Sequence, residues 1–321
     1  MTSDIDSSIT AKHYYNEESA YKHLESIRWD KGVICPHCKH SGADYIEPEK
    51  GTRKTRIGNV TFRRIWRCQK CKKQFSVLIG TIFEDSRIPL HKWLLAIHEL
   101  NTDKNGISSV ELSRKLGITQ KSAWFMAQRI RFAIAHTGLE EKLTGQVEVD
   151  ETYIGGKEKN KHWDKRTKNT QGRSTKKKTA VLSVIQRDGK VYSQKLRAVS
   201  GKNITEIVMK RVSRKAVLNT DTFPAYIPIG KYFKRHGVVD HRIYQYVNGT
   251  ASTNHAEGYF SQLKRSLTGT FHSVSKKHLD RYLAEFDYRY NTRHEKDTNR
   301  IIDTIKKSNG KRLTYKDLIA N

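Results

Sequence analysis

The apolar residues near the N-terminus are spaced as in an amphipathic helix. Tyr21, Leu24 and Ile27 recur every three residues, which predicts a helix within residues 14–29. A basic stretch with strand-like alternation follows this helix. The pattern therefore predicts a small N-terminal domain of one helix and short strands over residues 14–85.

Residues 90–135 keep helical spacing throughout. They predict a helix, a tight turn at Gly117 and a second helix that has Thr119 as its N-cap. The first of these helices has three apolar residues on one side, Val110, Leu112 and Leu116. This is the helix-turn-helix pattern, whose second helix commonly enters the DNA major groove, although an ordinary helical hairpin has the same spacing. We interpret residues 86–140 as a helix-turn-helix DNA-binding domain, because the chain is strongly basic.

From Gly145 onward the pattern changes to short strands that alternate with helices. Three strands come first, one over residues 146–156 and two on either side of the hairpin signal Asp188-Gly189. The elements after them are a helix (203–212), a strand (216–221), a short helical stretch, a strand (242–247) and two helices, the first starting near residue 254. This order predicts an α/β domain over residues 145–293, and the whole chain is expected to be a multidomain α+β protein.

The charge of the chain indicates its partner. Its 321 residues include 61 Lys or Arg against 33 Asp or Glu, which gives a net charge of +28. The excess is spread along the whole length, so we expect a polyanionic partner, and nucleic acid is the first candidate. No apolar run approaches the roughly 18 residues that cross a bilayer, and the N-terminus lacks the order of a signal peptide. We therefore expect an intracellular protein with no membrane partner.

Two segments carry much of the positive charge. Residues 157–178 hold ten Lys or Arg against two acidic residues and have no apolar periodicity, so we expect a flexible basic insertion. A solvated linker has the same composition, but contact with DNA phosphate is at least as good an interpretation where the segment leaves the first strand. Residues 294–321 are assigned to a basic C-terminal tail.

The four cysteines form two CxxC pairs, namely Cys35 with Cys38 and Cys68 with Cys71. This spacing lets both thiolates of a pair face one ion, and four thiolates complete a tetrahedral structural zinc site with no open position for chemistry. The 29 residues between the pairs suit a zinc ribbon with a long hairpin. His37 and His40 are alternative ligands, and redox chemistry is the alternative role, but two matched pairs favour structural Zn²⁺.

Three acidic residues stand out by their positions in the C-terminal domain. Asp150 alternates with two valines and so projects from the opposite face of the first strand. Asp221 ends the predicted fourth strand, and Glu257 lies at the start of the helix after the fifth. Each alone has an ordinary interpretation, as a surface acid, as an N-cap, or as the partner of Asn254 in a capping box.

Together the three acids fit a ribonuclease-H-like sheet. Such a sheet has one acid on its first central strand, one at the end of the neighbouring fourth strand and one on the helix after the fifth. Carboxylates that converge there can hold two Mg²⁺ or Mn²⁺ ions about 3.5 to 4 Å apart, which suits in-line displacement at phosphorus. Hard oxygen ligands favour these ions over zinc. Asp150, Asp221 and Glu257 are therefore the candidate catalytic and metal-binding residues.

The most specific motifs of the chain are VEVDETYIGGK, LNTD, TNHAEGYFSQLKR and GTFHSVSKKHLDRYLAEFDYRYNTR. With the LESIRWDKGVICPHC segment, they make nearly the whole chain resemble transposases of a bacterial insertion-sequence group related to the eukaryotic Merlin elements. The resemblance implies a zinc ribbon, a helix-turn-helix and an ISXO2-like catalytic domain of the DDE type. It matches Asp150 and Asp221 to the first two acids, and the 35 residues between Asp221 and Glu257 are a common spacing in DDE enzymes.

The resemblance leaves the third acid open, because some branches of the group have Asn in place of the final Glu. Asn254 lies three residues before Glu257. An anionic oxygen holds a divalent cation better than a neutral amide does, so we assign Glu257 to the metal and Asn254 to the helix N-cap. Lys264, about 20° from Glu257 on a helical wheel, is placed to touch DNA phosphate, although a solvated lysine is the ordinary interpretation. His255 is a further candidate, with polar packing as the alternative.

These features predict a DNA transposase. The ribbon and the helix-turn-helix would bind the terminal inverted repeats of an element, and the catalytic domain would hydrolyse the element ends and join the freed 3′-hydroxyls to target DNA. Because two ends must be paired, we expect a homodimer or larger assembly on double-stranded DNA, in the bacterial cytoplasm at the nucleoid. Two other classes stay open. They are a non-catalytic DNA-binding regulator, against which the three acids argue, and a ribonuclease-H-like nuclease, which the end-binding modules disfavour.

Overall fold

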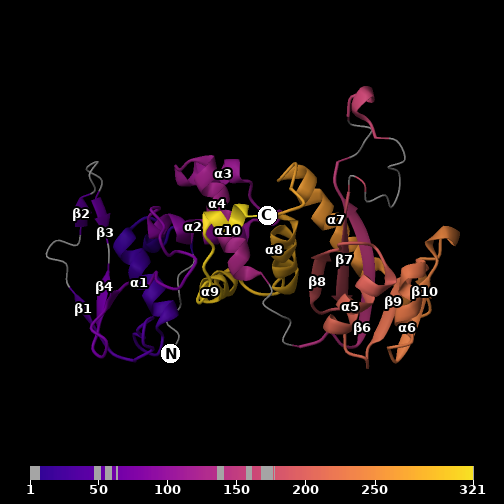
Figure 1. The fold of residues 1–321 in the computed structure, drawn as a ribbon, viewed down its shortest axis with the longest axis horizontal. Coiled ribbons are helices and arrows are strands. Elements are labelled where there is room, and N and C mark those ends of the chain that lie inside the picture. Colours follow the sequence, from indigo (N-terminus) through magenta and orange to yellow (C-terminus); the bar gives the residue numbers. More distant parts are fainter. Residues whose placement is uncertain are drawn as a thin grey trace. The chain divides into compact units, whose positions relative to one another are not determined.

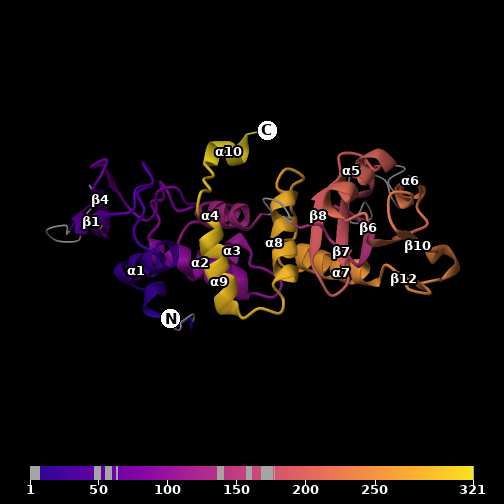
Figure 2. The same cartoon turned by 90° about the horizontal axis from the view of Figure 1, so that it is seen from below.

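The structure, a computed structural model, describes residues 8–46, 52–54, 60–62, 64–135, 141–156, 161–167, 176 and 178–320. The chain divides into two compact units, one made of Met1–Ile134 with His294–Asn321 and the other of Ala135–Arg293. Both units combine helices and strands, in agreement with the predicted α+β class. Their elements are labelled in Figure 1 and, seen from below, in Figure 2.

The start of the first unit contains one long helix and small sheets. Helix α1 (Glu17–Arg28) follows a 3-10 turn (Lys12–Tyr14), and its N-cap Asn16 accepts a hydrogen bond from the Ser19 N–H. The predicted apolar stripe is confirmed, because all three of its residues are buried. An antiparallel sheet in the order β1-β4-β5 follows, with β1 (Ala43–Ile46), β4 (Ile65–Cys68) and β5 (Gln74–Phe75). A separate antiparallel pair consists of β2 (Thr52–Lys54) and β3 (Val60–Phe62).

The helices of the first unit include the predicted helix-turn-helix segment. Besides α1, they are α2 (Leu90–Thr102), α3 (Ser109–Leu116), α4 (Gln120–Ile134), α9 (Asp297–Lys307) and α10 (Tyr315–Ile319). Gly117 ends α3 in the left-handed region at φ 59°, and Thr119 Oγ1 accepts from the Ser122 N–H at 3.3 Å, so the predicted turn and cap are confirmed. Val110 was wrongly assigned to the apolar side, since it is 45% exposed.

The basic residues of α4 differ in their access to solvent. Arg129 and Arg131 are buried, and the Arg129 guanidinium donates to the Glu84 carbonyl at 2.7 Å. Gln120 and Lys121, in the first turn of α4, are exposed. Any DNA contact made by this helix therefore involves its N-terminal turn rather than its arginines.

The segment expected as a basic tail folds instead as part of the first unit. Ile301 and Ile305 of α9 lie in the core that α1, α2 and α4 build. Arg28 Nη2 donates to Asn309 Oδ1 at 3.0 Å, and the Gly310 N–H donates to the Gly80 carbonyl at 2.8 Å. The segment contains many charged residues, but it also has a short apolar stripe of helical spacing. This stripe is enough to pack the helix against the core.

The second unit is built on a mixed sheet in the order β10-β9-β6-β7-β8. Its strands are β6 (Gln146–Ile154), β7 (Thr179–Gln186), β8 (Val191–Lys195), β9 (Val217–Asp221) and β10 (Arg235–Val239). The first three strands are antiparallel to one another, and β9 and β10 run parallel to β6. This is the strand order that the predicted ribonuclease-H-like arrangement requires, with the first strand at the centre.

Helices cover both faces of this sheet. Helix α5 (Gly201–Arg211) packs on the face that carries Val147 and Val149, beside the short α6 (Ile227–Gly230). Helices α7 (Asn254–Gly269) and α8 (Leu279–Asn291) pack on the other face, which carries Val181 and Ile185. Figure 2 shows α5 and α7 on opposite sides of the strands.

The fifth strand lies earlier in the chain than predicted. The sequence predicts it over residues 242–247, but the strand is β10, and His241–Ile243 form a 3-10 turn. Gly237 interrupts the pattern of strand-forming side chains, so the sequence does not indicate a strand there. A Cβ at Gly237 would lie 2.6 Å from the Ala251 Cβ, so close packing demands glycine there.

The predicted basic insertion is described only in part. Residues 157–160, 168–175 and 177 lie outside the described residues. The described part includes a 3-10 turn, Trp163–Lys165.

Candidate active site and metal centre

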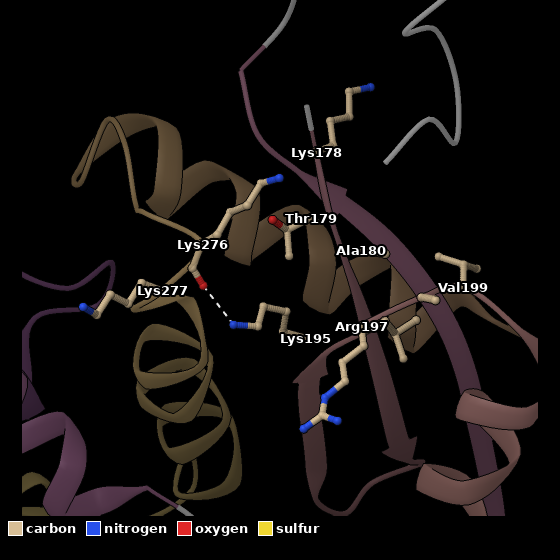
Figure 3. A pocket seen from close by; sticks show the side chains of 10 residues that line it. Lys178, Thr179, Ala180, Lys195, Arg197, Val199, Lys276 and Lys277 are labelled. Carbon is tan, nitrogen blue, oxygen red and sulfur yellow. Dashed lines mark hydrogen bonds between the residues drawn. The ribbon is translucent and has the colours of Figure 1, made fainter. Parts of the chain in front are cut away.

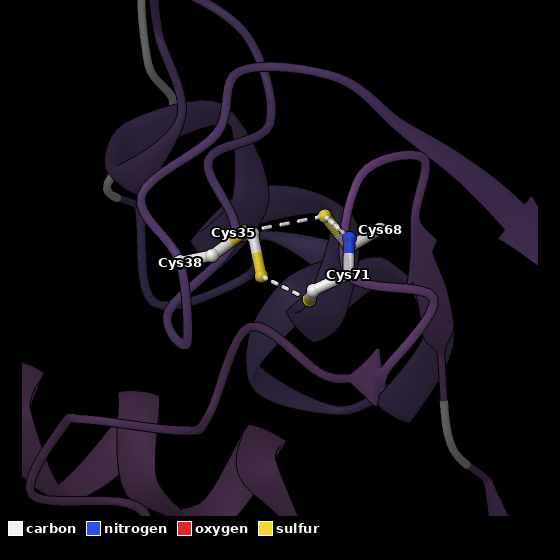
Figure 4. Close-up of side chains that lie close together, drawn as sticks. All are labelled: Cys35, Cys38, Cys68 and Cys71. Atoms are coloured by element: carbon white, nitrogen blue, oxygen red, sulfur yellow. Dashed lines mark hydrogen bonds between the residues drawn. The ribbon is translucent and has the colours of Figure 1, made fainter.

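The four cysteines come from two loops with matching backbone geometry. In each loop the residue after the second cysteine has a positive φ, 60° at Lys39 and 58° at Lys72. The Lys39 N–H donates to the Cys35 carbonyl at 2.9 Å, and the Lys72 N–H donates to the Cys68 carbonyl at 3.0 Å. The two loops face each other, as Figure 4 shows.

The sulfur atoms fit a tetrahedral zinc ion. Cys35 Sγ lies 3.7 Å from Cys71 Sγ, and Cys38 Sγ lies 3.6 Å from Cys68 Sγ. Zn–S bonds of about 2.3 Å at tetrahedral angles put sulfur atoms about 3.8 Å apart. A metal ion can be held by a group of three or more His, Cys, Asp or Glu residues whose ligand atoms all lie within 4.8 Å of one another. Within the described ranges, the four cysteines form the only such group. The predicted ligands are therefore brought together, and the alternative histidines are not among them.

Asp150 and Asp221 lie at matching positions on neighbouring parallel strands. The pairing of β6 with β9 ends at Glu148 with Asn219. Each acid comes two residues later, so the same register places them side by side beyond the last pair. Asp221 Oδ1 accepts from the Phe223 N–H at 2.9 Å, which holds the carboxylate at the point where the chain leaves the strand.

Glu257, the third candidate acid, lies in the first turn of α7 and is half-exposed. Its charge, like that of Asp221, acts on Asp150. Burial raises the pKa of Asp150 to about 8, together with the charges of Glu151, Asp221 and Glu257. A divalent cation relieves such repulsion between carboxylates, so the site fits a metal. The three acids are not all within 4.8 Å of one another, which is compatible with two ions that have different ligands.

The start of α7 is capped by a residue that the sequence analysis missed. Asn254 was assigned as the N-cap, but it is the first helical residue, and the N-cap Thr253 makes no side-chain cap. The buried Glu148 takes this role, since its Oε2 accepts from the His255 N–H at 2.9 Å and from the Ala256 N–H at 3.2 Å. A carboxylate from the sheet therefore replaces the local cap.

Glu148 also joins the sheet to the segment before α7. Arg187 Nε donates to Glu148 Oε1 at 2.8 Å, and the Arg187 Nη2 donates to Ser252 Oγ at 2.8 Å. His255 Nδ1 lies 3.0 Å from the same carboxylate oxygen. The sequence signal for Glu148 is its place two residues before Asp150, on the same strand face.

Two Glu→Gln substitutions separate the structural from the candidate catalytic carboxylate. Glu148→Gln is expected to lower the free energy of unfolding by about 3 kcal/mol, because it leaves the buried Arg187 contact and the helix start without their anion. Glu257→Gln, at a half-exposed position, is expected to change it by less than about 0.5 kcal/mol. Urea denaturation without metal measures both. Equal losses would contradict the assignment of Glu148 as the cap.

His241 is a second residue that the sequence analysis missed. Its Nε2 lies 3.0 Å from Thr253 Oγ1 and 3.5 Å from Glu257 Oε1. It lines an open cavity of about 350 Å³ that Asp221 also lines. The sequence analysis placed the fifth strand too late in the chain, so it did not consider His241 as a neighbour of the acids. An isolated histidine after a strand carries no signal of its own.

The remaining candidates occupy two different positions on α7. His255 contacts Glu148, as described above, and so has the polar packing role. Lys264 is exposed, two helical turns beyond Glu257 on the same helix. Its position leaves it accessible to a phosphate beside the acids.

A basic pocket of about 390 Å³ lies at the same end of the sheet as Asp221 (Figure 3). Thr179, which lines it, pairs with Ile154 at the end of β6, and Lys195 ends β8. Of the ten described residues that line the pocket, none is acidic and half are basic, namely Lys178, Lys195, Arg197, Lys276 and Lys277. Lys195 Nζ donates to the Lys276 carbonyl at 3.0 Å. The pocket is therefore suited to an anion.

Comparison with known proteins identifies the family. Residues 142–291 match the ISXO2-like transposase domain, and residues 15–74 match the transposase zinc-ribbon domain. A protein of the archaeon Halobacterium salinarum, described as an uncharacterized protein in transposable element ISH50, is 30% identical over 290 residues. The match covers 87% of this chain and 92% of that protein. The sequence analysis expected a bacterial group, but this relative is archaeal, so the family is not restricted to bacteria.

Solved structures are similar over part of the chain. The intasome of simian T-cell lymphotropic virus in complex with PP2A regulatory subunit B56 gamma gives a TM-score of 0.28 at 14% identity, covering 58% of this chain and 66% of that chain. The Mos1 transposase paired-end complex with left transposon end gives 0.23 at 13% identity, covering 64% and 77%. With scores this low, the assignment rests on the sequence matches.

No helix among the described residues has the length and apolar character needed to cross a membrane. The zinc ribbon, the strand order of the second unit and the sequence matches agree with one another. The chain belongs to the ISXO2-like family of transposases, DDE-type enzymes with a zinc ribbon that cut and join DNA.

Proposed function

We propose that this transposase hydrolyses phosphodiester bonds at the ends of an insertion sequence and transfers the freed 3′-hydroxyls to target DNA. Asp150, Asp221 and Glu257 are its catalytic carboxylates and hold two Mg²⁺ or Mn²⁺ ions. The observation that supports this proposal is the matching register of Asp150 and Asp221 on β6 and β9, together with the charge of Glu257 in the first turn of α7, which helps to raise the pKa of Asp150.

The protein contributes rigid positions to this reaction. When bound, a pair of divalent ions activates the attacking hydroxyl and stabilises the leaving oxygen at phosphorus. Asp150 and Asp221 are fixed by neighbouring strands, and Glu148 fixes the start of α7 and so the position of Glu257. Lys264 contacts the phosphate next to the scissile one.

DNA recognition is assigned to the first unit. The zinc ribbon and the α3–α4 helix-turn-helix bind the terminal inverted repeats, with Gln120 and Lys121 at the exposed start of α4 in the major groove. Because two ends must be held together, the active form is a homodimer or larger assembly on double-stranded DNA. We place the chain with the Merlin-related bacterial branch on its four motifs, acting in the cytoplasm at the nucleoid.

The basic pocket gives the second unit its own contact with the DNA backbone. Lys276→Ala with Lys277→Ala is expected to reduce the slope of log affinity against log salt by about two, because each phosphate contact contributes about 0.9. Affinity falls equally for element-end and random DNA. Fluorescence anisotropy over a salt series measures this.

The control for the pocket is Lys210→Ala with Lys215→Ala, which removes two exposed lysines near the C-terminal end of α5 and before β9, neither of which lines the pocket. This pair is expected to leave the slope unchanged. An unchanged slope in the pocket variant, or the same reduction in both, would show that the pocket does not hold phosphate.

The experiment that tests the function is an assay of cleavage and strand joining on element-end DNA with Mg²⁺. The wild-type chain is expected to nick the ends and to join them to a target duplex. Binding without cleavage would identify a regulator instead. Cleavage of branched DNA without joining would identify a nuclease.

A further inference from the structure

The connection between β10 and α7 carries an exposed apolar surface. We call residues 242–247 the tip segment. Four of its large apolar side chains are exposed, Ile243 at 68%, Tyr244 at 82%, Tyr246 at 52% and Val247 at 55%. A single exposed apolar side chain is ordinary, but four within five consecutive residues form a patch of the kind that marks an interaction site.

The tip segment is a built structure, anchored on both sides. Asp240 Oδ1 accepts from the Arg242 N–H at 3.0 Å, and the Asp240 carbonyl accepts from the Gln245 N–H at 3.2 Å. At the C-terminal end of the tip segment, β11 (Val247–Asn248) pairs with β12 (Ala251–Ser252). The apolar side chains are therefore presented in a defined geometry.

The backbone at the most exposed residue is strained. Tyr244 has φ 60° and ψ 21°, in the left-handed region that bulky residues rarely adopt. The Tyr244 N–H donates to the His241 carbonyl at 3.2 Å, which helps to fix this conformation. Strained residues of this kind occur at ligand clamps, where the surrounding contacts hold a side chain toward its ligand.

The tip segment lies one contact away from the candidate acids. The Tyr246 ring is 5.5 Å from the His241 ring, centroid to centroid. His241 Nε2 in turn lies 3.5 Å from Glu257 Oε1 and shares a cavity with Asp221. A phosphodiester held at these acids would therefore have its neighbouring nucleotides close to the tip segment.

We propose that Tyr244 and Tyr246 stack on unpaired DNA bases next to the scissile phosphate. This inference rests on the proposed function, since it requires DNA at the acids. Inside a duplex each base face is covered by its neighbours, so a tyrosine ring reaches only a base that has left the stack. Stacking on aromatic side chains is independent of base identity and compensates for the lost pairing. The net charge of +28 favours nucleic acid over a second copy of the chain as the occupant.

The test compares cleavage of two element-end duplexes, one fully paired and one with a short mismatched bubble at the cleavage site. The Tyr244→Ala, Tyr246→Ala double variant is expected to cut the paired duplex about ten- to a hundredfold more slowly than wild type. It is expected to recover to within about twofold on the bubble, because those bases are already unpaired. The matching double Phe variant keeps the rings and is expected to cut both substrates normally.

The control is Tyr232→Ala, which removes another exposed tyrosine of the same unit outside the tip segment. Equal slowing of the double Ala variant on both substrates, or no slowing at all, overturns the stacking role. A change in its oligomeric state without DNA, seen by sedimentation, assigns the patch to a second copy and also overturns it. A wild-type chain that cuts neither substrate defeats the proposed function itself, whereas wild-type cleavage with a normal double Ala variant defeats this inference alone.

Discussion

Replacing Asp150 with Asn is expected to slow end cleavage and strand joining by about a thousandfold or more. The neutral amide removes an anionic metal ligand, and metal stabilisation of the transition state amounts to several kcal/mol. DNA binding is expected to persist, because the proposed recognition elements lie in the other unit. Single-turnover rates on labelled element ends, with binding measured in parallel, check both expectations.

Companion variants make this result specific to the site. Asp221→Asn and Glu257→Gln are expected to behave like Asp150→Asn, and Asn254→Ala is expected to remain active. Asp188→Asn makes the same change at an exposed hairpin residue and is expected to remain fully active. Full activity in Glu257→Gln with loss in Asn254→Ala would assign the third ligand to the asparagine.

Loss of zinc is expected to unfold the ribbon and to abolish binding of element ends. Cys35 and Cys68 are fully buried, and their small cluster includes Phe75 and few other apolar side chains. Such a module depends on its metal, which contributes about 10 kcal/mol or more to the folding of small zinc domains. Cys68→Ser is therefore expected to lose the bound zinc and to expose the strands β4 and β5 of the ribbon to proteolysis.

Zinc content and limited proteolysis, measured together with end binding, check this expectation. One zinc per chain is expected in the wild type. His37→Ala and His40→Ala are the matched controls and are expected to retain it, because neither histidine belongs to the cysteine cluster. A Cys68→Ser chain with normal zinc and normal binding would contradict the structural role of the site.

The sequence predicted those features that depend on local spacing. Each CxxC pair closes within a single turn, so only the meeting of the two pairs required the fold. The alternation of β6 placed Asp150 on one face, and the strand that ends at Asp221 was short and apolar enough to identify. These features follow from residues that are neighbours in the chain.

The features that were missed depend on partners far apart in the sequence. Glu148 caps a helix 107 residues later, so its role appears only once β6 and α7 are packed together. His241 lies beside the acids because β10 is Arg235–Val239, a strand whose Gly237 weakens its pattern. Tertiary contacts override local signals at both places, as they do when a distant carboxylate replaces the predicted Asn254 cap.

The docking of α9 onto α1, α2 and α4 has a consequence for synthesis on the ribosome. A domain usually folds as soon as its residues emerge. The first unit, however, lacks Ile301 and Ile305 of its core until the second unit, Ala135–Arg293, has been translated. The second unit is therefore expected to fold before the first is complete. A nascent chain then completes the unit to which DNA recognition is proposed only after its candidate catalytic carboxylates have been assembled.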